Sequence, residues 1–292
     1  MTIIPSLRKE KTTHTQRHGS PGLRPMPVLA AAAAAALLAC SLVAGTSAWN
    51  DPGDGNWNET SKWTPNSSQT DGQIANGATV TINGVEGMQT YANFSVTNNS
   101  GLRLINMHAD NDGQVITGTL TMTNATLYVE GSDSGNKLTM ESGGILLTDT
   151  TVNIDAGSSL YIHWGTIGLS GNTILNFNGN SESGSLGPGY LGAGSTLTFT
   201  DFTGKINLNL NNVPDGDYSL LSAESFSGIT PDGLFAAITV TGDSASRAEV
   251  YVSEEFDDLR VKISSVPEPA AFAAFAGLAI LAWALTGRRR RE

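Results

Sequence analysis

The residues of this sequence best suited to acid–base chemistry are two carboxylates and an imidazole, on Asp149, Asp155 and His163. The aspartates flank an alternating run at 151–154, and Trp164 follows the histidine. If successive coils of the chain stacked in register, these groups would meet above an aromatic floor and could serve glycoside cleavage. However, aspartate at a strand end is common turn chemistry, and a lone histidine in a strand usually satisfies a hydrogen bond. We therefore predict no catalytic residue and keep a carbohydrate-active enzyme as the alternative.

Two acidic stretches resemble the start of metal-binding loops but lack the remaining ligands. Residues 108–113, with the sequence HADNDG, are not followed by the glutamate of a calcium-binding hand, and Glu59 stands where the stretch at 54–59 would need glycine. Paired Cys/His spacings and a Gly-x-Ser-x-Gly elbow are also missing from the sequence. No metal, cofactor or activated nucleophile is therefore predicted.

The central part of the chain is strongly acidic. Residues 49–265 contain 7 basic and 24 acidic side chains, a net charge of 7 minus 24, or −17. Such a surface repels phosphate backbones, so we predict no nucleic-acid partner. Acidity in an exported protein also serves solubility. The only cysteine, Cys40, precedes this part, which therefore has no disulfide or thiol chemistry.

Short alternating runs dominate the chain between residues 77 and 210. Apolar and β-branched residues alternate with Thr and Asn, which is typical of half-buried strands. Asn, Asp, Gly and Ser separate the runs and favour sharp turns, for example at Asn124. The runs lie at 78–82, 119–122, 125–129, 151–154, 159–162, 173–177, 196–199 and 205–210. The pattern predicts an all-β protein.

The brevity of these runs and the lack of long loops favour a solenoid over a sandwich. The triplet Leu-Thr-Met occurs at 120–122 and again at 138–140, a separation of 18 residues that we interpret as about one rung of a parallel β-helix. In such a stack each coil pairs with the coils above and below, and inward apolar residues form a continuous core. We predict a parallel β-helix, or β-solenoid, over 76–210 and a further β segment over 211–265.

Three tryptophans stand close together at the start of the body. Trp49, Trp57 and Trp63 lie among turn-forming residues, and we predict that residues 49–75 form a cap over the first rung. A sugar-stacking platform is the alternative, because an indole face suits a pyranose ring.

Both ends of the body resemble a known class of proteins. The spacing of the three tryptophans resembles the opening of autotransporter-associated β-strand repeat proteins, and the sequence GDYSLL at 216–221 resembles the start of their closing segment. The resemblance implies a solenoid whose last rung is shielded by the segment at 211–265.

Residues 1–48 have the organisation of a secretory signal peptide. A basic leader precedes an almost wholly apolar run at 28–44, and residues 46–48 offer the small side chains that a signal peptidase reads. We predict export by the Sec machinery and cleavage after Ala48. The alternative is lipidation of Cys40, because the preceding Leu-Leu-Ala resembles a lipoprotein box.

The end of the chain combines three features in order. Pro267, Glu268 and Pro269 form a stiff segment that is incompatible with a helix. The uncharged, mostly apolar stretch at 270–287 is about long enough to cross a membrane as a helix. Four basic residues then resist translocation and stop the chain in the membrane; they are Arg288, Arg289, Arg290 and Arg291. A plain C-terminal membrane anchor would explain the last two features alone.

The order of the three features resembles the PEP-CTERM sorting signal of Gram-negative bacteria. The resemblance covers residues 266–292 and implies that an exosortase, a membrane cysteine transpeptidase-like enzyme, processes the chain at 267–269. It also implies an inner-membrane intermediate, held by a transient transmembrane helix, and a final location at the cell surface or in the extracellular matrix.

These observations predict a non-enzymatic structural or adhesive protein of the cell surface or matrix, with extracellular polysaccharide as its candidate partner. The alternative is a carbohydrate-active β-helix enzyme or a polysaccharide-binding module that uses exposed Trp, Tyr and carboxylate side chains.

Overall fold

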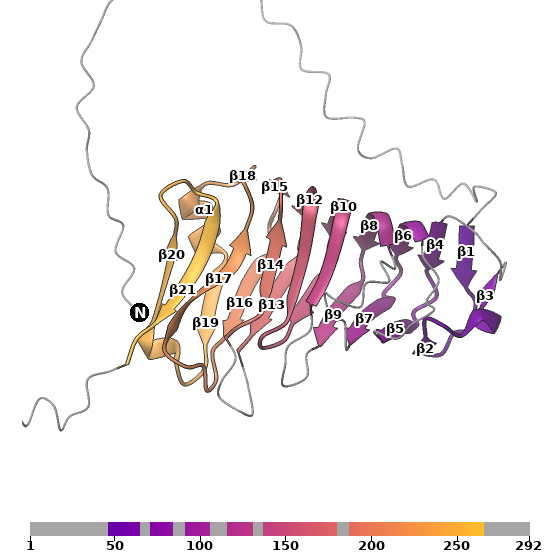
Figure 1. Cartoon of the computed structure of the whole chain (residues 1–292), viewed down its shortest axis with the longest axis horizontal. Helices are drawn as coiled ribbons and strands as arrows, with labels where there is room; N and C mark the ends of the chain where they lie inside the picture. Colours follow the sequence, from indigo (N-terminus) through magenta and orange to yellow (C-terminus); the bar gives the residue numbers. More distant parts are fainter. Residues whose placement is uncertain are drawn as a thin grey trace, which may run out of the picture.

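The computed structural model describes residues 46–64, 71–83, 91–105, 116–130, 137–179 and 187–265. Within these ranges the chain is an all-β parallel solenoid of about six turns, elongated along its axis (Figure 1). The fold class predicted from the alternating runs is therefore confirmed. The strands of these residues form one sheet of 13 strands and a second sheet of 8.

The large sheet consists of β1 (Thr46–Trp49), β3 (Trp63–Thr64), β4 (Asp71–Ile74), β6 (Tyr91–Val96), β8 (Ile116–Thr123), β10 (Lys137–Thr148), β12 (Ser159–Ser170), β14 (Tyr190–Ala193), β15 (Thr196–Thr200), β17 (Gly216–Ser222), β18 (Ser225–Ser227), β20 (Ala248–Val252) and β21 (Asp258–Ile263). The smaller sheet consists of β2 (Gly55–Asn56), β5 (Thr79–Asn83), β7 (Gly101–Ile105), β9 (Thr126–Glu130), β11 (Thr151–Ile154), β13 (Ile174–Asn178), β16 (Lys205–Asn209) and β19 (Ile238–Thr241). The other described elements are the helix α1 (Pro231–Ala236) and the 3-10 turns η1 (Thr60–Lys62) and η2 (Ala245–Arg247).

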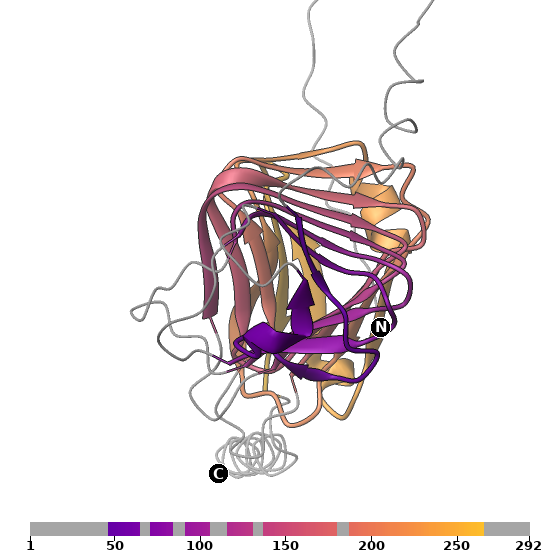
Figure 2. The ribbon, with the colours of Figure 1, turned by 90° about the vertical axis from the view of Figure 1, so that its right-hand side faces the viewer.

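The coils have three walls because the long strands of the large sheet bend around a corner (Figure 2). In β12 the first half pairs with β14 and the second half pairs with β15. The first wall is the part of the large sheet that contains β14 and the first half of β12. The second wall is the part that contains β15 and the second half of β12, and the smaller sheet is the third wall. Beyond β12 the first wall continues through β14, β17, β21 and β20.

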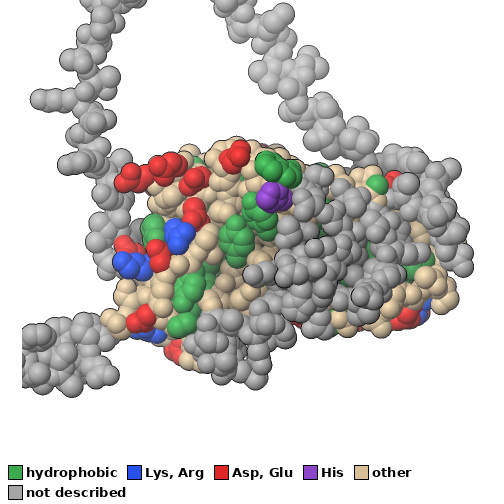
Figure 3. Space-filling model, viewed as in Figure 1, with side chains coloured by type: hydrophobic (Ala, Val, Ile, Leu, Met, Phe, Trp, Pro, Cys, Tyr) green, Lys and Arg blue, Asp and Glu red, His purple; other side chains and the backbone are tan. Residues whose placement is uncertain are grey.

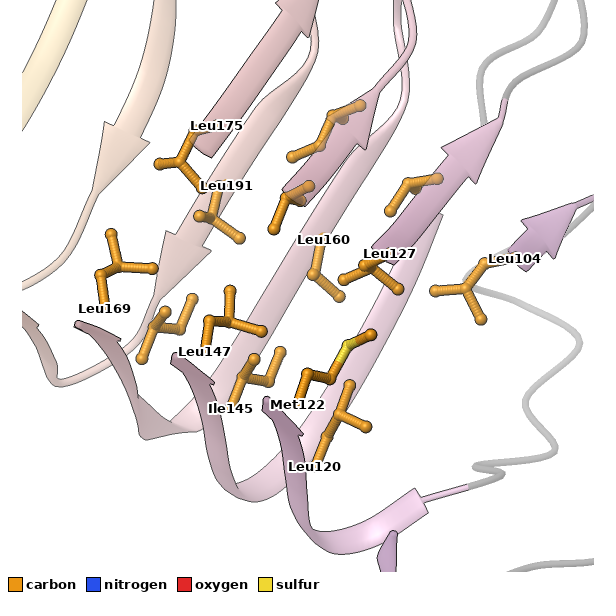
Figure 4. Packing of buried hydrophobic residues seen from close by; sticks show 14 of the residues in the cluster. Leu104, Leu120, Met122, Leu127, Ile145, Leu147, Leu160, Leu169, Leu175 and Leu191 are labelled. Atoms are coloured by element: carbon orange, nitrogen blue, oxygen red, sulfur yellow. The ribbon is translucent and has the colours of Figure 1, made fainter. Parts of the chain in front are cut away.

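Alternation of apolar and polar side chains explains why these segments are strands. In β5 the side chains of Val80 and Ile82 point inward and are fully buried, while Thr79 and Thr81 face outward. Parallel pairing stacks such positions coil upon coil. Figure 4 shows the buried side chains meeting in the interior, so that the stack has one continuous core.

The corner between the second and third walls is a repeated tight turn. Asn124 and Asp149 hold positive φ angles of 49° and 50° in successive coils, and Gly171 follows with 58°. Asn and Asp tolerate this left-handed conformation better than other residues that carry a side chain, so the turn predicted at Asn124 is confirmed. Inside the corner, the buried hydroxyls of Thr150 and Thr173 donate to backbone carbonyls of the preceding coil.

The corner between the first and second walls is a column of glycines, formed by Gly118, Gly143 and Gly165. A Cβ at position 143 would lie 1.9 Å from the Gly118 carbonyl oxygen, and one at position 165 would lie 2.2 Å from the Gly143 oxygen. Gly143 also has a φ of +104°, which residues with a side chain rarely adopt. The backbones of successive coils thus approach too closely at this bend for a side chain.

The length of a coil differs from the predicted one. Leu120 is in register with Ile145, and Leu138 is in register with Leu160, separations of 25 and 22 residues. The prediction that the Leu-Thr-Met triplets mark one rung of 18 residues is therefore wrong. The triplet at 120–122 lies in the second wall and that at 138–140 in the first wall. The two triplets have the same sequence pattern because strands in both walls alternate inward apolar side chains with outward polar ones.

Asparagines form a ladder on the outer face of the third wall. The Asn176 amide donates to the side-chain oxygen of Asn153 at 2.8 Å, and the Asn207 amide donates to that of Asn176 at 2.8 Å. Asn176 is therefore the middle member and makes both ladder bonds.

We expect Asn176→Ala to lower the free energy of unfolding by about 1–2 kcal/mol, because it removes two part-buried hydrogen bonds of about 0.5–1.5 kcal/mol each. Asn153→Ala removes one such bond and should cost about half as much. Urea denaturation followed by circular dichroism measures both values. Equal losses in the two variants would contradict a ladder that the middle residue bridges.

Antiparallel pairing occurs at both ends of the stack. Near the start, β1 pairs in parallel with β4 and antiparallel with β3. At the other end, β21 pairs antiparallel with both β17 and β20. Parallel pairing involves residues from Thr46 to Thr241, beyond the range 76–210 that the sequence pattern assigned to the solenoid.

Candidate functional site

The three groups singled out for acid–base chemistry occupy different corners of the coils. Asp149 lies between β10 and β11, Asp155 lies between β11 and β12, and His163 lies at the bend within β12. Thr150 and the four residues of β11 separate the two aspartates, and β11 alone spans about 13 Å at about 3.3 Å per residue. The structure therefore does not bring these groups together as an acid–base site.

Both aspartates hold turns. Asp149 Oδ1 accepts a hydrogen bond of 2.8 Å from the backbone N–H of Asn172, and Asp155 Oδ1 accepts one of 3.3 Å from the side-chain amide of Asn178. Each contact ties a turn to the next coil. This is the turn chemistry that strand-end aspartates commonly perform.

His163 and Trp164 belong instead to a group of rings on the outer face of the first wall. Trp164 is 67% exposed, and its ring centroid lies 4.7 Å from that of His163. Tyr161 lies 6.1 Å from His163 and stacks on Tyr190 of β14 at 6.4 Å, with 24° between the ring planes. Figure 3 shows the purple histidine among green hydrophobic side chains on this face. We call Tyr161, His163, Trp164 and Tyr190 the aromatic patch.

A glycine gives the patch its shape. A Cβ at position 192 would lie 2.1 Å from the hydroxyl oxygen of Tyr190 and 2.8 Å from a ring carbon of Tyr161. Gly192 and Tyr190 are two residues apart on β14, so they face the same side of the sheet. The two tyrosine side chains therefore lean over Gly192 and lie along the sheet surface.

Hydroxyl and carboxylate groups continue the patch across the first wall. The hydroxyls of Tyr190 and Ser222, on neighbouring strands, lie 2.5 Å apart. Burial raises the pKa of the Tyr190 phenol, so this hydroxyl stays protonated at neutral pH. Further along the wall, Ser219 donates to Asp258 at 2.6 Å.

Arg260 is shared between two carboxylates at the far side of this face. Its Nη1 donates to Asp258 at 2.7 Å and its Nε donates to Asp217 at 3.1 Å, while the Tyr251 hydroxyl donates to Asp217 at 2.7 Å. We call Ser219, Asp258, Arg260, Asp217 and Tyr251 the polar network. The hydrogen bond from Tyr251, followed by that from Arg260, holds the pKa of Asp217 below its ordinary value. A catalytic acid for glycoside cleavage needs a raised pKa instead, so Asp217 suits hydrogen bonding better than proton donation.

The lowered pKa of Asp217 predicts a stability that depends on pH. A carboxyl whose pKa is lower in the folded state stabilises the fold above its unfolded value, about 3.8, and this contribution disappears as the pH falls through the folded pKa. We expect Asp217→Asn to be less stable than the wild type at pH 7, by a small amount because Asp217 is exposed. The difference should narrow below pH ~4.

Thermal unfolding from pH 7 to pH 3 measures this effect. Glu249→Gln, which removes an exposed charge from β20, two strands away from β17 in the same sheet, is the matched control for net charge. If the difference in stability between the wild type and Asp217→Asn stayed constant from pH 7 to pH 3, the lowered pKa of Asp217 would not contribute to stability as predicted.

The sequence pattern did not reveal the polar network. A usable signal was present, because polar residues alternate in Asp217 and Ser219, and again in Asp258, Arg260 and Lys262. That alternation marks an outward face in each strand. What places the two faces together is the antiparallel register of β17 and β21, which pairs Ser219 with Arg260.

The tryptophans near the start of the stack are not a binding platform. Trp49, Trp57 and Trp63 are 3%, 1% and 1% exposed. The Trp63 ring centroid lies 5.2 Å from that of Trp49 and 5.3 Å from that of Trp57, in edge-to-face contacts. The sugar-stacking alternative for these residues is therefore wrong, because their faces are buried against one another and the core.

The residues predicted for sorting are only partly within the described structure. Pro267, Glu268, Pro269 and the arginines at 288–291 lie outside the described residues, as do the apolar stretch at 270–287 and Cys40. Ala48, the predicted cleavage position, lies within β1, so a cut there would remove three of the four residues of that strand. The part of the chain that the structure describes contains no helix long and apolar enough to cross a membrane. Nor does it contain a group of three or more His, Cys, Asp or Glu residues placed to hold a metal ion.

Comparisons with known proteins add no assignment, since no family model, no curated protein and no solved structure matches the chain.

Proposed function

We propose that this chain is an exported structural or adhesive protein of a bacterial cell surface or extracellular matrix. The observation that carries the proposal is how the ionisable groups of the stack are used. Asp149 and Asp155 tie turns together, and Asp217 and Asp258 on the first wall accept hydrogen bonds from Arg260 and from hydroxyl groups. Stacked coils with one continuous core make a stiff rod whose outer faces are available to partners.

The elements at the two ends of the rod act as caps in this proposal. At one end Trp49, Trp57 and Trp63, all of which follow the predicted cleavage position, are buried against one another. At the other end β20 and β21 replace parallel pairing by antiparallel pairing. We propose that these elements prevent coils of neighbouring molecules from adding to the stack, because an open strand edge invites further pairing.

The terminal segments supply the route in this proposal. Residues 1–48 direct the chain to the Sec machinery. Residues 266–292 hold it in the inner membrane until an exosortase acts at Pro267, Glu268 and Pro269, with Arg288 to Arg291 as the membrane stop. The support is the order of a Pro-Glu-Pro motif, an apolar stretch and an arginine cluster.

Cell fractionation of the source bacterium tests the route. We expect the wild-type chain at the surface, and a chain lacking residues 266–292 to be missing there. Replacing Pro267 and Pro269 with alanine should leave the protein in the inner membrane. Replacing Ser264 and Ser265, just before the signal, is the matched control and should change nothing. Unaltered delivery of the chain without residues 266–292 would refute the sorting role.

A polysaccharide-binding module is the second candidate, and the exposed ring of Trp164 favours it. The two functions are compatible, because a matrix protein can bind the polymer that surrounds it.

A further inference from the structure

We propose that the aromatic patch and the polar network form one binding face for an uncharged polysaccharide. The inference rests on the proposed surface role and names the partner of that surface.

The exposure of Trp164 is the first observation. Among the described residues, only Trp164 and Leu146 are large hydrophobic side chains left exposed, at 67% and 45%. A single exposed apolar residue is ordinary on a protein surface. Trp164, however, is the end of a row of four rings: it contacts His163, His163 contacts Tyr161, and Tyr161 stacks on Tyr190. A partner that covered these rings would remove a large apolar area from water.

The shape of the patch fits sugar rings. The axial C–H groups of a pyranose form an apolar face, which packs on the face of an aromatic ring. Tyr190 and Tyr161 lean along the sheet over Gly192, so they form a low, flat surface on which such a face can rest. Trp164 adds a larger ring at the bend of β12.

The polar network offers hydrogen-bond partners for the hydroxyl groups of a sugar. Sugar hydroxyls project from the ring edge and lose water on binding, so each requires a hydrogen-bond partner. Asp258 and Asp217 offer carboxylate oxygens, and Arg260 between them offers several N–H donors. Ser222 and Tyr190 offer hydroxyls closer to the rings.

The extent of the face favours a polymer over a single sugar. The rings lie on β12 and β14, and the polar network lies on β17, β21 and β20, which follow in that order across the first wall. Four steps between neighbouring strands span about 19 Å at about 4.8 Å each. A chain of several sugar units can therefore contact rings and network at once.

Charge favours an uncharged polymer. Residues 49–265 carry a net charge of −17, and within the polar network two carboxylates face one arginine. Polymers rich in uronate or sulfate would be repelled.

Affinity electrophoresis of the full-length chain, in native gels containing detergent and a soluble polymer, tests the proposal. The uncharged probes are hydroxyethyl cellulose, xyloglucan, dextran and laminarin, and the anionic probe is polygalacturonate. We expect at least one uncharged probe to retard the wild-type chain and polygalacturonate not to do so. Trp164→Ala should weaken the retarding interaction about tenfold, the size of effect typical of an aromatic anchor.

Two further variants separate stacking from general surface effects. Trp164→Phe keeps a ring and should retain most of the affinity, while Leu146→Ala removes the other exposed hydrophobic residue, on the second wall, and should behave as the wild type. An unchanged thermal midpoint shows that each variant is folded.

The proposal is overturned if none of the four uncharged probes retards the chain, if Trp164→Ala is retarded as strongly as the wild type, or if polygalacturonate binds more tightly. It is also overturned if sedimentation without polymer shows self-association that Trp164→Ala abolishes, because the patch would then contact a second copy. If the chain reaches the surface but does not bind the polymers, only this inference is wrong. If the chain binds the polymers but does not reach the surface, only the proposed surface role is wrong.

Discussion

Replacing Gly143 with alanine is expected to lower the free energy of unfolding by about 3–5 kcal/mol, the largest loss that we predict for a single methyl group in this chain. The new Cβ would lie 1.9 Å from the Gly118 carbonyl oxygen, and backbone atoms of a packed coil cannot move aside cheaply. The φ of +104° at this residue adds strain for any residue with a side chain. Denaturant unfolding followed by circular dichroism measures the loss.

Gly144→Ala is the matched control because it adds the same methyl group one residue further along β10. A Cβ at position 144 would meet no atom closer than 3.6 Å, an ordinary contact distance. We expect Gly144→Ala to change the free energy of unfolding by about 1 kcal/mol or less. If Gly143→Ala unfolded at the same denaturant concentration as Gly144→Ala, the glycine column would not hold the bend as described.

Trp63→Ala should cost about 3–5 kcal/mol, the usual range for removing a large aromatic side chain from a core. Trp63 contacts the rings of Trp49, Trp57 and Phe94, and its indole N–H donates to the Trp57 carbonyl oxygen at 3.0 Å. The variant leaves a cavity at the N-terminal end of the stack and removes the hydrogen bond to the Trp57 carbonyl. Thermal and denaturant unfolding measure the effect.

Trp164→Ala removes the same side chain from the surface and provides the comparison. Because Trp164 is 67% exposed, its loss should change the free energy of unfolding by less than about 1 kcal/mol. Similar losses in the two variants would contradict the division of the tryptophans into a buried end cluster and an exposed patch.

The strands could be predicted from the sequence because their signal is local. Val80 and Ile82 alternate with threonines, and that pattern alone indicates which side chains point inward. The coil length could not be predicted in the same way, because the segments between strands differ in length. Val80 to Leu102 is 22 residues, whereas Leu175 to Ile206 is 31. Variation of this size hides a fixed period.

The residues at the corners of the coils recur in a pattern that does not depend on a fixed coil length. Glycine is followed two residues later by Leu or Ile at 118–120, 143–145 and 165–167, and these three segments lie side by side at the glycine column. The corner between the second and third walls has a recurring pattern of its own, because Asn124 and Asp149 each follow a threonine there. Turn residues, compared with one another, mark the coils of this chain better than the apolar runs do.

The candidate site was predictable only in part. Residue type alone indicates Trp164 and His163, but the sequence does not show that Asp149 and Asp155 lie at other corners of the coil. Arg260 and Asp217 are 43 residues apart in the sequence and meet through the antiparallel pairing of β17 and β21. Local patterns do not encode that pairing.

In the proposed function, the stack is an exported surface protein that is processed at both ends. The most direct test is the intact mass of the protein recovered from the surface of the source bacterium. We predict a form that has lost the N-terminal leader and the segment containing Arg288 to Arg291. A surface form that retains those arginines, or a full-length chain found only in the cytoplasm, would contradict it.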